Sequence, residues 1–311
     1  MNKLVVILGP TASGKTDLSI KLAKKFSGEV VSADSRQVYK GMDIGSGKIT
    51  KKEMQRIPHY LLDVANPKTR FSVAQYQKLA LSAIKKIHNK NKVPFLVGGT
   101  GFYIQSIVDG IIIPEIKPYW NLRKELEKMT TEQMFKKLKK LDPKRAGSID
   151  KHNPRRLVRA LEIVLATGKP VPLLFPGSPA SGKFNVLQIG ITKSKDELKN
   201  LIQKRLAKRL KNNLMINEVK KLRKSGVSFK RLEEFGLEYR YVAQYLQNKI
   251  TYQEMRDKIQ IESEHYAKRQ MTWFKRESPS GEPNKKIHWV KNYKEALELS
   301  KKFIANEKPL P

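Results

Sequence analysis

The segment GPTASGKT, residues 9–16, limits the fold of this chain more than any other feature of the sequence. It lies between the apolar run LVVIL and the amphipathic run DLSIKLAKKF. The spacing G-x-x-x-x-G-K-[ST] between a strand and a helix is typical of a P-loop, whose backbone amides and helix N-terminus face an anion. Lys15 would add a positive charge, and the Thr16 hydroxyl could reach a Mg²⁺ ion. The predicted phosphate-binding residues are Gly9, Pro10, Thr11, Ala12, Ser13, Gly14, Lys15 and Thr16.

The P-loop motif does not by itself identify the ligand. A diphosphate on any organic group fits the same cradle as a nucleotide such as ATP. An ATP-binding kinase is therefore the default interpretation of the motif, and other features of the sequence are needed to identify the ligand.

The pattern of strands and helices around the P-loop predicts an α/β fold with a parallel sheet. In the first hundred residues, strands are expected at 3–9, 29–33 and 93–99, and helices at 16–26 and 71–91. The strand pattern returns at 185–192, where the chain is expected to rejoin the sheet. Long helices are then expected at 198–222 and 252–277, and a short strand at 287–290 and a helix at 293–304 close the core.

A purely helical and basic stretch interrupts this pattern. Helices are expected at 119–129, 131–141 and 153–168, the last with Asn153 as N-cap and Pro154 at its first position. We therefore predict an all-helical insert domain at residues 116–183, with residues 1–115 and 184–311 forming a P-loop-type core flanked by helices. The turn-rich segment 168–183 at the end of the insert is typical of a mobile connection.

Charge and composition narrow the class of partner. The chain has 63 Lys and Arg against 29 Asp and Glu, a formal charge of +34. Such an excess favours a polyanion, and nucleic acid is the expected partner, although a lysine-rich solvated surface would give the same count. With no cysteine, disulfides, thiolate metal sites and cysteine catalysis are excluded. No apolar run has the length of a membrane helix, so we expect a cytoplasmic protein without a membrane segment.

Two further motifs follow predicted strands. SADSRQVY, residues 32–39, ends the second strand, and VGGTGFY, residues 97–103, ends the third. Open parallel sheets bind their ligands at these carboxyl ends, so Asp34 is expected beside the P-loop. A turn or N-cap aspartate is the alternative for Asp34, and the polar neighbours Ser35, Arg36 and Gln37 favour a functional cluster.

Taken together and in order, GPTASGKT, SADSRQVY, DVANPKTRFSVAQY, VGGTGFY, RRLVRALE and YAKRQMTWFKR resemble the motifs of bacterial tRNA dimethylallyltransferases, also called tRNA isopentenyltransferases. The resemblance spans roughly residues 3–277. It implies a core that binds dimethylallyl diphosphate and transfers its five-carbon group, with Mg²⁺, to N6 of adenine 37 beside the anticodon of tRNA. A small-molecule or nucleotide kinase and a non-enzymatic RNA-binding module remain the alternatives, and we expect a monomer.

The resemblance also implies roles for individual residues. Asp34 matches the general base, Thr16 the metal-binding hydroxyl, and Arg209 a helical arginine that contacts the diphosphate. One turn earlier on that helix, Arg205 is interpreted as part of a solvated basic face. Arg155, Arg156 and Arg159 form a basic stripe suited to phosphates of the anticodon stem. The segment FGLEYR departs from the shorter glycine-tyrosine-arginine motif of the family. The expected tRNA-binding residues are Asp34, Ser35, Arg36, Gln37, Thr100, Arg123, Arg155, Arg156, Arg159 and Arg240.

Overall fold

A computed structural model of the chain describes residues 2–111, 113, 119–171, 184–276 and 287–305. The chain divides into two compact units. One unit combines Met1–Val108 with Gly182–Pro311, and the other is Asp109–Ser181. The sequence placed these boundaries at 115/116 and 183/184, because the helical pattern becomes visible only some residues after the chain leaves the sheet.

Within the described residues, six parallel strands form one sheet in the order β3-β2-β4-β1-β5-β6. The strands are β1 (Lys3–Leu8), β2 (Glu29–Ala33), β3 (His59–Tyr60), β4 (Pro94–Gly98), β5 (Asn185–Ile191) and β6 (Ile287–Val290). The α/β fold and the return of the chain to the sheet at β5 are confirmed. The sequence did not predict β3, because two residues are too few to show an alternating pattern.

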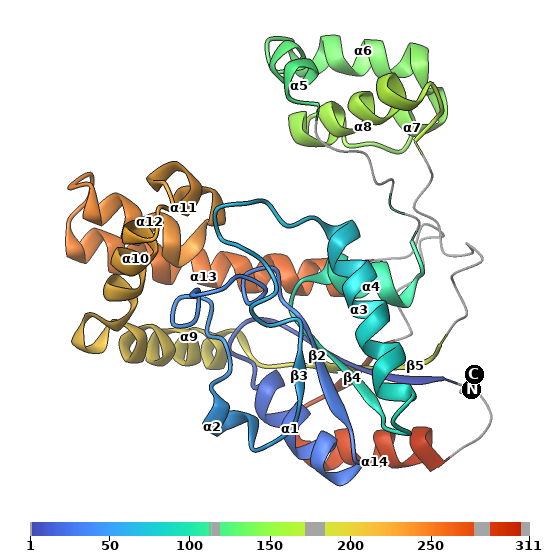
Figure 1. The fold of residues 1–311 in the computed structure, drawn as a ribbon, viewed down its shortest axis with the longest axis vertical. Coiled ribbons are helices and arrows are strands. Elements are labelled where there is room, and N and C mark those ends of the chain that lie inside the picture. Colours follow the sequence, from blue (N-terminus) through green and yellow to red (C-terminus); the bar gives the residue numbers. More distant parts are fainter. Residues whose placement is uncertain (1, 112, 114–118, 172–183, 277–286, 306–311) are drawn as a thin grey trace. The chain divides into compact units, whose positions relative to one another are not determined.

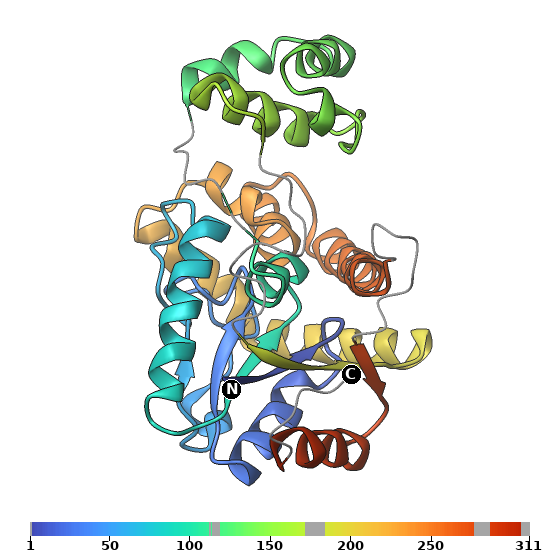
Figure 2. The same cartoon turned by 90° about the vertical axis from the view of Figure 1, so that its right-hand side faces the viewer.

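Helices cover both faces of the sheet (Figures 1 and 2). On one face α1 (Lys15–Lys25) and α14 (Tyr293–Ala305) pack on Val5 and Ile7 of β1, with Leu22 and Phe303 in the same apolar cluster. The other face packs on α3 (Val73–His88), α4 (Gly101–Val108) and the helices that follow β5. The parallel strands all end at the same edge, so the loops after β1, β2 and β4 meet there.

The helices after β5 build the wall beside this edge. They are α9 (Lys195–Leu210), α10 (Leu214–Lys224), α11 (Phe229–Phe235), α12 (Leu237–Leu246) and α13 (Tyr252–Lys275), and the short α2 (Lys51–Met54) precedes β3. The prediction of one helix over 198–222 is wrong, because α9 and α10 are separated by a 3-10 turn at Lys211–Asn213. Asn212 and Asn213 have φ of 52° and 54°, the left-handed conformation that asparagine tolerates better than most residues.

The insert unit is helical in its described part. It contains α5 (Trp120–Leu126), α6 (Thr131–Leu141), α7 (Pro143–Ala146) and α8 (Pro154–Thr167). Its apolar cluster includes Leu126, Met134, Leu138 and Leu161. Asn153 caps α8 as predicted by accepting a hydrogen bond from the backbone of Arg156. The predicted connection at 168–183 lies outside the described residues from 172 onwards.

No helix in the described ranges is long and apolar enough to cross a membrane.

Candidate active site

The P-loop forms the turn between β1 and α1 that the sequence predicts. Gly9 and Gly14 have φ of 146° and 89°, and Ala12 also has a positive φ of 62°. The loop therefore turns sharply before α1 begins at Lys15. The Ser13 hydroxyl is buried and has no hydrogen-bond partner among the described residues. A buried polar atom without a partner in this loop fits a site that a polar ligand completes.

Lys15 points back over the P-loop and donates a hydrogen bond to the Pro10 carbonyl at 2.5 Å. Burial and the positive charge of Arg205 together lower the pKa of Lys15 to about 7, against the opposing effect of the negative charge of Asp34. The loop thus holds an ammonium group whose charge depends on a nearby anion.

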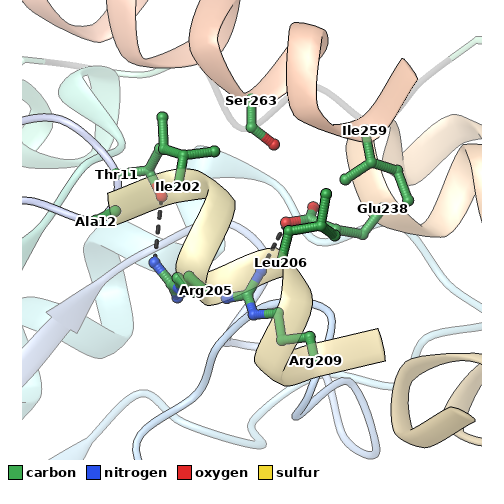
Figure 3. A pocket seen from close by; sticks show the side chains of 9 residues that line it. All are labelled: Thr11, Ala12, Ile202, Arg205, Leu206, Arg209, Glu238, Ile259 and Ser263. Carbon is green, nitrogen blue, oxygen red and sulfur yellow. Dashed lines mark hydrogen bonds and ion pairs between the residues drawn. The ribbon is translucent and has the colours of Figure 1, made fainter. Parts of the chain in front are cut away.

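A small pocket opens between the P-loop and the helices that follow β5 (Figure 3). Arg205 and Arg209 of α9 and Glu238 of α12 provide its charged groups. The residues that line it are Thr11, Ala12, Ile202, Arg205, Leu206, Arg209, Glu238, Ile259 and Ser263.

Arg205 joins α9 to the P-loop. Its guanidinium donates to the Thr11 hydroxyl at 3.3 Å (Figure 3). It also donates to the Gly47 carbonyl at 3.5 Å. Burial lowers its pKa to about 10, and the neighbouring charge of Arg209 acts in the same direction. Among the described residues it forms no ion pair with a carboxylate. The interpretation of Arg205 as part of a solvated helix face is therefore wrong. The spacing of four residues from Arg209 places both arginines on one helix face, but it does not indicate whether that face is buried.

The loop that carries Gly47 packs closely against the guanidiniums of Arg205 and Arg209. Gly47 has φ of 63°, and a Cβ there would lie 1.7 Å from Nη2 of Arg205 and 2.0 Å from Nη2 of Arg209. The loop is held by the buried Glu218, whose carboxylate accepts hydrogen bonds from the backbone of Asp43, Ile44 and Gly45. Sequence reasoning missed Glu218, since one glutamate on an amphipathic helix gives no distinguishing signal.

Asp34 follows β2 and lies close to the P-loop. Its Oδ1 accepts hydrogen bonds from the backbone of Arg36 at 2.8 Å and of Gln37 at 3.2 Å. Asp34 therefore does cap a turn, which was the alternative interpretation of this residue. No hydrogen bond to Oδ2 occurs among the residues that the structure describes. Its charge also raises the pKa of Lys15, which shows that the two groups are close enough to interact.

Thr100 connects the turn at Asp34 to the loop after β4. Its hydroxyl accepts a hydrogen bond from the backbone of Ser35 at 3.0 Å. On α13, burial raises the pKa of Tyr266 to about 12, with the charge of Asp34 acting in the same direction and Thr100 in the opposite one. Tyr266 is therefore a neutral phenol at physiological pH.

Gln270 on α13 bridges two of the loops, and sequence reasoning missed it. Its Oε1 accepts from the backbone of Thr11 at 2.8 Å, and its Nε2 donates to the Gly99 carbonyl at 2.8 Å. Its place in the motif YAKRQMTWFKR was the one signal that could have found it.

The other residues expected to contact tRNA in the core have partners within the protein. Arg36 donates from Nε to the Phe235 carbonyl at 2.7 Å, and Gln37 donates to the Gly47 carbonyl at 3.3 Å. Arg240 is exposed and donates to the Glu233 carbonyl at 3.2 Å. These bonds hold the side chains in place at the edges of the loops.

In the insert, the expected phosphate-binding arginines fall into two groups. Arg155 and Arg156 are exposed in the first turn of α8. Arg123 and Arg159 instead pair with Glu162, at 2.8 Å and 2.6 Å, and this carboxylate is fully buried. Arg123 and Arg159 therefore contribute to the core of the insert whatever else they contact.

Protein groups alone do not form a metal site here. The described residues contain no group of three or more His, Cys, Asp or Glu that could hold a metal ion. Thr16 is exposed at the start of α1, and Mg²⁺ is often bound through one or two protein oxygens together with phosphate oxygens and waters. The donor set thus fits a Mg²⁺ ion that arrives with a phosphate-containing ligand.

Comparison with known proteins gives one consistent result. Residues 37–277 match the family model described as IPP transferase. The tRNA dimethylallyltransferase of Thermoanaerobacter sp. (strain X514) is 39% identical over 309 residues, which cover 97% of this chain and 96% of that protein. The tRNA dimethylallyltransferase of Caldicellulosiruptor saccharolyticus is 42% identical over 278 residues, covering 88% of this chain and 89% of that protein.

Solved structures agree with the sequence matches. The full-length tRNA isopentenylpyrophosphate transferase of Bacillus halodurans is 37% identical, has a TM-score of 0.70, and covers 98% of this chain and 96% of its own. A eukaryotic dimethylallyltransferase described as acting on tRNA is 25% identical, has a TM-score of 0.84, and covers 100% of this chain and 81% of its own.

Proposed function

Because this chain belongs to the IPP transferase family, we propose that it transfers a dimethylallyl group from dimethylallyl diphosphate to N6 of adenine 37 in tRNA and releases diphosphate. The observation that supports this most is the convergence of the P-loop, the two arginines of α9 and Asp34 at one edge of the sheet. Such a site can bind a leaving diphosphate and take a proton from a nucleophile beside it.

Different residues of the site act on the nucleophile and on the leaving group. The exocyclic amine of adenine is a weak nucleophile, so a carboxylate must remove its proton as the bond between the allylic carbon and the diphosphate oxygen opens. Asp34 is the proposed base. The diphosphate gains charge as it leaves, so Lys15, Arg205 and Arg209 bind it more strongly in the transition state than in the ground state.

Mg²⁺ is proposed as the cofactor, with Thr16 as its protein ligand. The ion would neutralise part of the charge on the diphosphate. Burial of Lys15 and Arg205 favours their electrostatic contacts with the diphosphate, since such contacts become stronger as water is excluded.

Adenine 37 has to leave its stack to reach this site, because a base within a stacked loop does not expose N6 to a pocket. We propose that Ser35, Arg36, Gln37 and Thr100 read the extruded nucleotide. The exposed Arg155 and Arg156 of the insert are proposed to contact phosphates of the stem. The protein is further proposed to act as a cytoplasmic monomer.

The test is transfer of label. Purified protein with Mg²⁺ and labelled dimethylallyl diphosphate is incubated with unmodified tRNA, and in parallel with [γ-³²P]ATP and a mixture of small-molecule acceptors. We expect label in tRNA from the prenyl donor only, and loss of that label in Lys15→Ala. Phosphate transfer from ATP without prenyl transfer would identify a kinase, and binding of tRNA without either transfer would identify a binding module.

A further inference from the structure

Glu238 is an unusual group for a pocket that binds an anion. Among the described residues that line the pocket it is the one carboxylate, and it faces two guanidiniums (Figure 3). Arg209 donates to Glu238 at 2.7 Å, and the side chains of the pair are only 11% and 14% exposed. A carboxylate at this place repels a diphosphate and occupies one of the arginines that would bind it.

The backbone fixes Glu238 firmly in this position. Gly236 and Leu237 before it have φ of 74° and 42°, so the chain turns sharply into α12. Tyr239 after it is buried, and its hydroxyl donates to Glu218 at 2.9 Å and accepts from the backbone of Ser46 at 3.1 Å. The backbone at Glu238 therefore cannot shift without disturbing a buried network.

The charges explain what a carboxylate does here. Arg205 and Arg209 lie one turn apart on α9, and Lys15 lies close to Arg205. Without a bound anion these cations repel one another in a poorly hydrated space, and Glu238 offsets part of that repulsion. A diphosphate that enters must bind Arg209 alongside Glu238 or displace Glu238 from its ion pair with Arg209.

We propose that Glu238 is a positioning residue that competes with the diphosphate for Arg209 and thereby lowers the affinity of the site for both the prenyl donor and the released diphosphate. The inference rests on the proposed function. As the product leaves, Glu238 forms its ion pair with Arg209 again, and this prevents released diphosphate from blocking the site.

The test is the affinity for inorganic diphosphate, measured by calorimetry in the presence of Mg²⁺. In Glu238→Gln we expect the dissociation constant to fall by about five- to tenfold, the effect of removing one partly buried competing ion pair. The inhibition constant of diphosphate in the transfer assay should fall by the same factor. In a background of Arg209→Ala, Glu238→Gln should lower the dissociation constant by a smaller factor than in the wild type, because only the direct repulsion between Glu238 and diphosphate would remain.

Glu262→Gln provides the matched control. Glu262 lies on α13 outside the pocket, where it pairs with His265 and Arg269, and its replacement removes the same charge. Its dissociation constant for diphosphate should equal that of the wild type. If Glu238 only braces Arg209, Glu238→Gln will instead weaken diphosphate binding, and that result or an unchanged affinity would overturn the inference. A wild-type protein that binds no diphosphate would overturn the proposed function as well.

Discussion

At the scale of single residues, the site depends on charges that interact across loops from different strands. Asp34 raises the pKa of Lys15 while burial and Arg205 lower it, so the protonation of one group depends on the state of the others. Two predictions follow from this coupling, one for the carboxylate and one for the lysine.

Replacement of Asp34 by Asn separates its two roles. Asn keeps an oxygen that can accept from the backbone of Arg36 and Gln37, so the turn should persist. It removes the base, and we expect the rate of single-turnover transfer to fall by roughly 100- to 10,000-fold, the usual contribution of a positioned general base. Dissociation constants for tRNA and diphosphate should stay near the wild-type values. A variant that transfers at the wild-type rate would show that Asp34 only caps the turn.

The pKa of Lys15 makes diphosphate binding depend on pH. Without a ligand this pKa is about 7, and a bound anion raises it, so the protein takes up a proton on binding above pH 7. The affinity for diphosphate should therefore be highest below pH 7 and fall as the pH rises towards 9. Lys15→Arg is the control, because arginine stays charged in this range and the ionisation of diphosphate affects both proteins equally. Parallel pH profiles for the two proteins would contradict the prediction.

At the scale of secondary-structure elements, helix caps and buried ion pairs determine the positions of the helices. Glu162 on α8 accepts from Arg123, from Arg159 and from the backbone of Tyr119, and thus ties α5 to α8. These contacts lower the pKa of Glu162 to about 2 against the opposing effect of burial. The stability that Glu162 contributes is complete above its unfolded pKa near 4.5 and is lost as the pH falls through 2.

Glu162→Gln should therefore destabilise the insert. Removal of one partner from a buried ion pair typically costs about 3–5 kcal/mol, which is a large part of the stability of a small helical unit. We expect the insert to become sensitive to limited proteolysis at pH 7 while the core stays intact. Glu132→Gln, which removes an exposed i,i+4 pair with Lys136, should leave the cleavage pattern unchanged. Equal resistance of both variants would show that Glu162 is dispensable.

At the scale of the whole molecule, the charge of +34 governs the encounter with a polyanion. Neutralised phosphates release counterions, so the affinity for tRNA should fall steeply as salt rises. Replacement of both Arg155 and Arg156 by Ala should reduce the slope of log K against log salt by about 1–2. Lys301→Ala on α14, which removes an exposed cation paired with Glu298, should leave the slope unchanged. If the affinity of the wild type for tRNA did not change with salt, this would contradict a phosphate-binding role for these charges.

The sequence by itself determined the local structure and the class of the protein. The P-loop, the strand before it, the helix after it and the cap at Asn153 depend on contacts within a few residues, so their patterns are visible in the chain. The motif order was enough to place the chain in its family. Asp34 could be assigned to the sheet edge because parallel strands end together.

Only the tertiary structure decided which charged side chains face one another. Arg205 was misjudged because a helical arginine looks the same in sequence whether it faces solvent or a loop 194 residues away. Glu218, Gln270 and Glu238 escaped notice for the same reason, since their partners come from distant segments. The break at Asn212 was also missed, although two adjacent asparagines, which tolerate the left-handed conformation, were a local signal for it. Local sequence patterns determine the helices, strands and turns. The site is determined by burial and by pairing of charges from distant segments, which no short segment encodes.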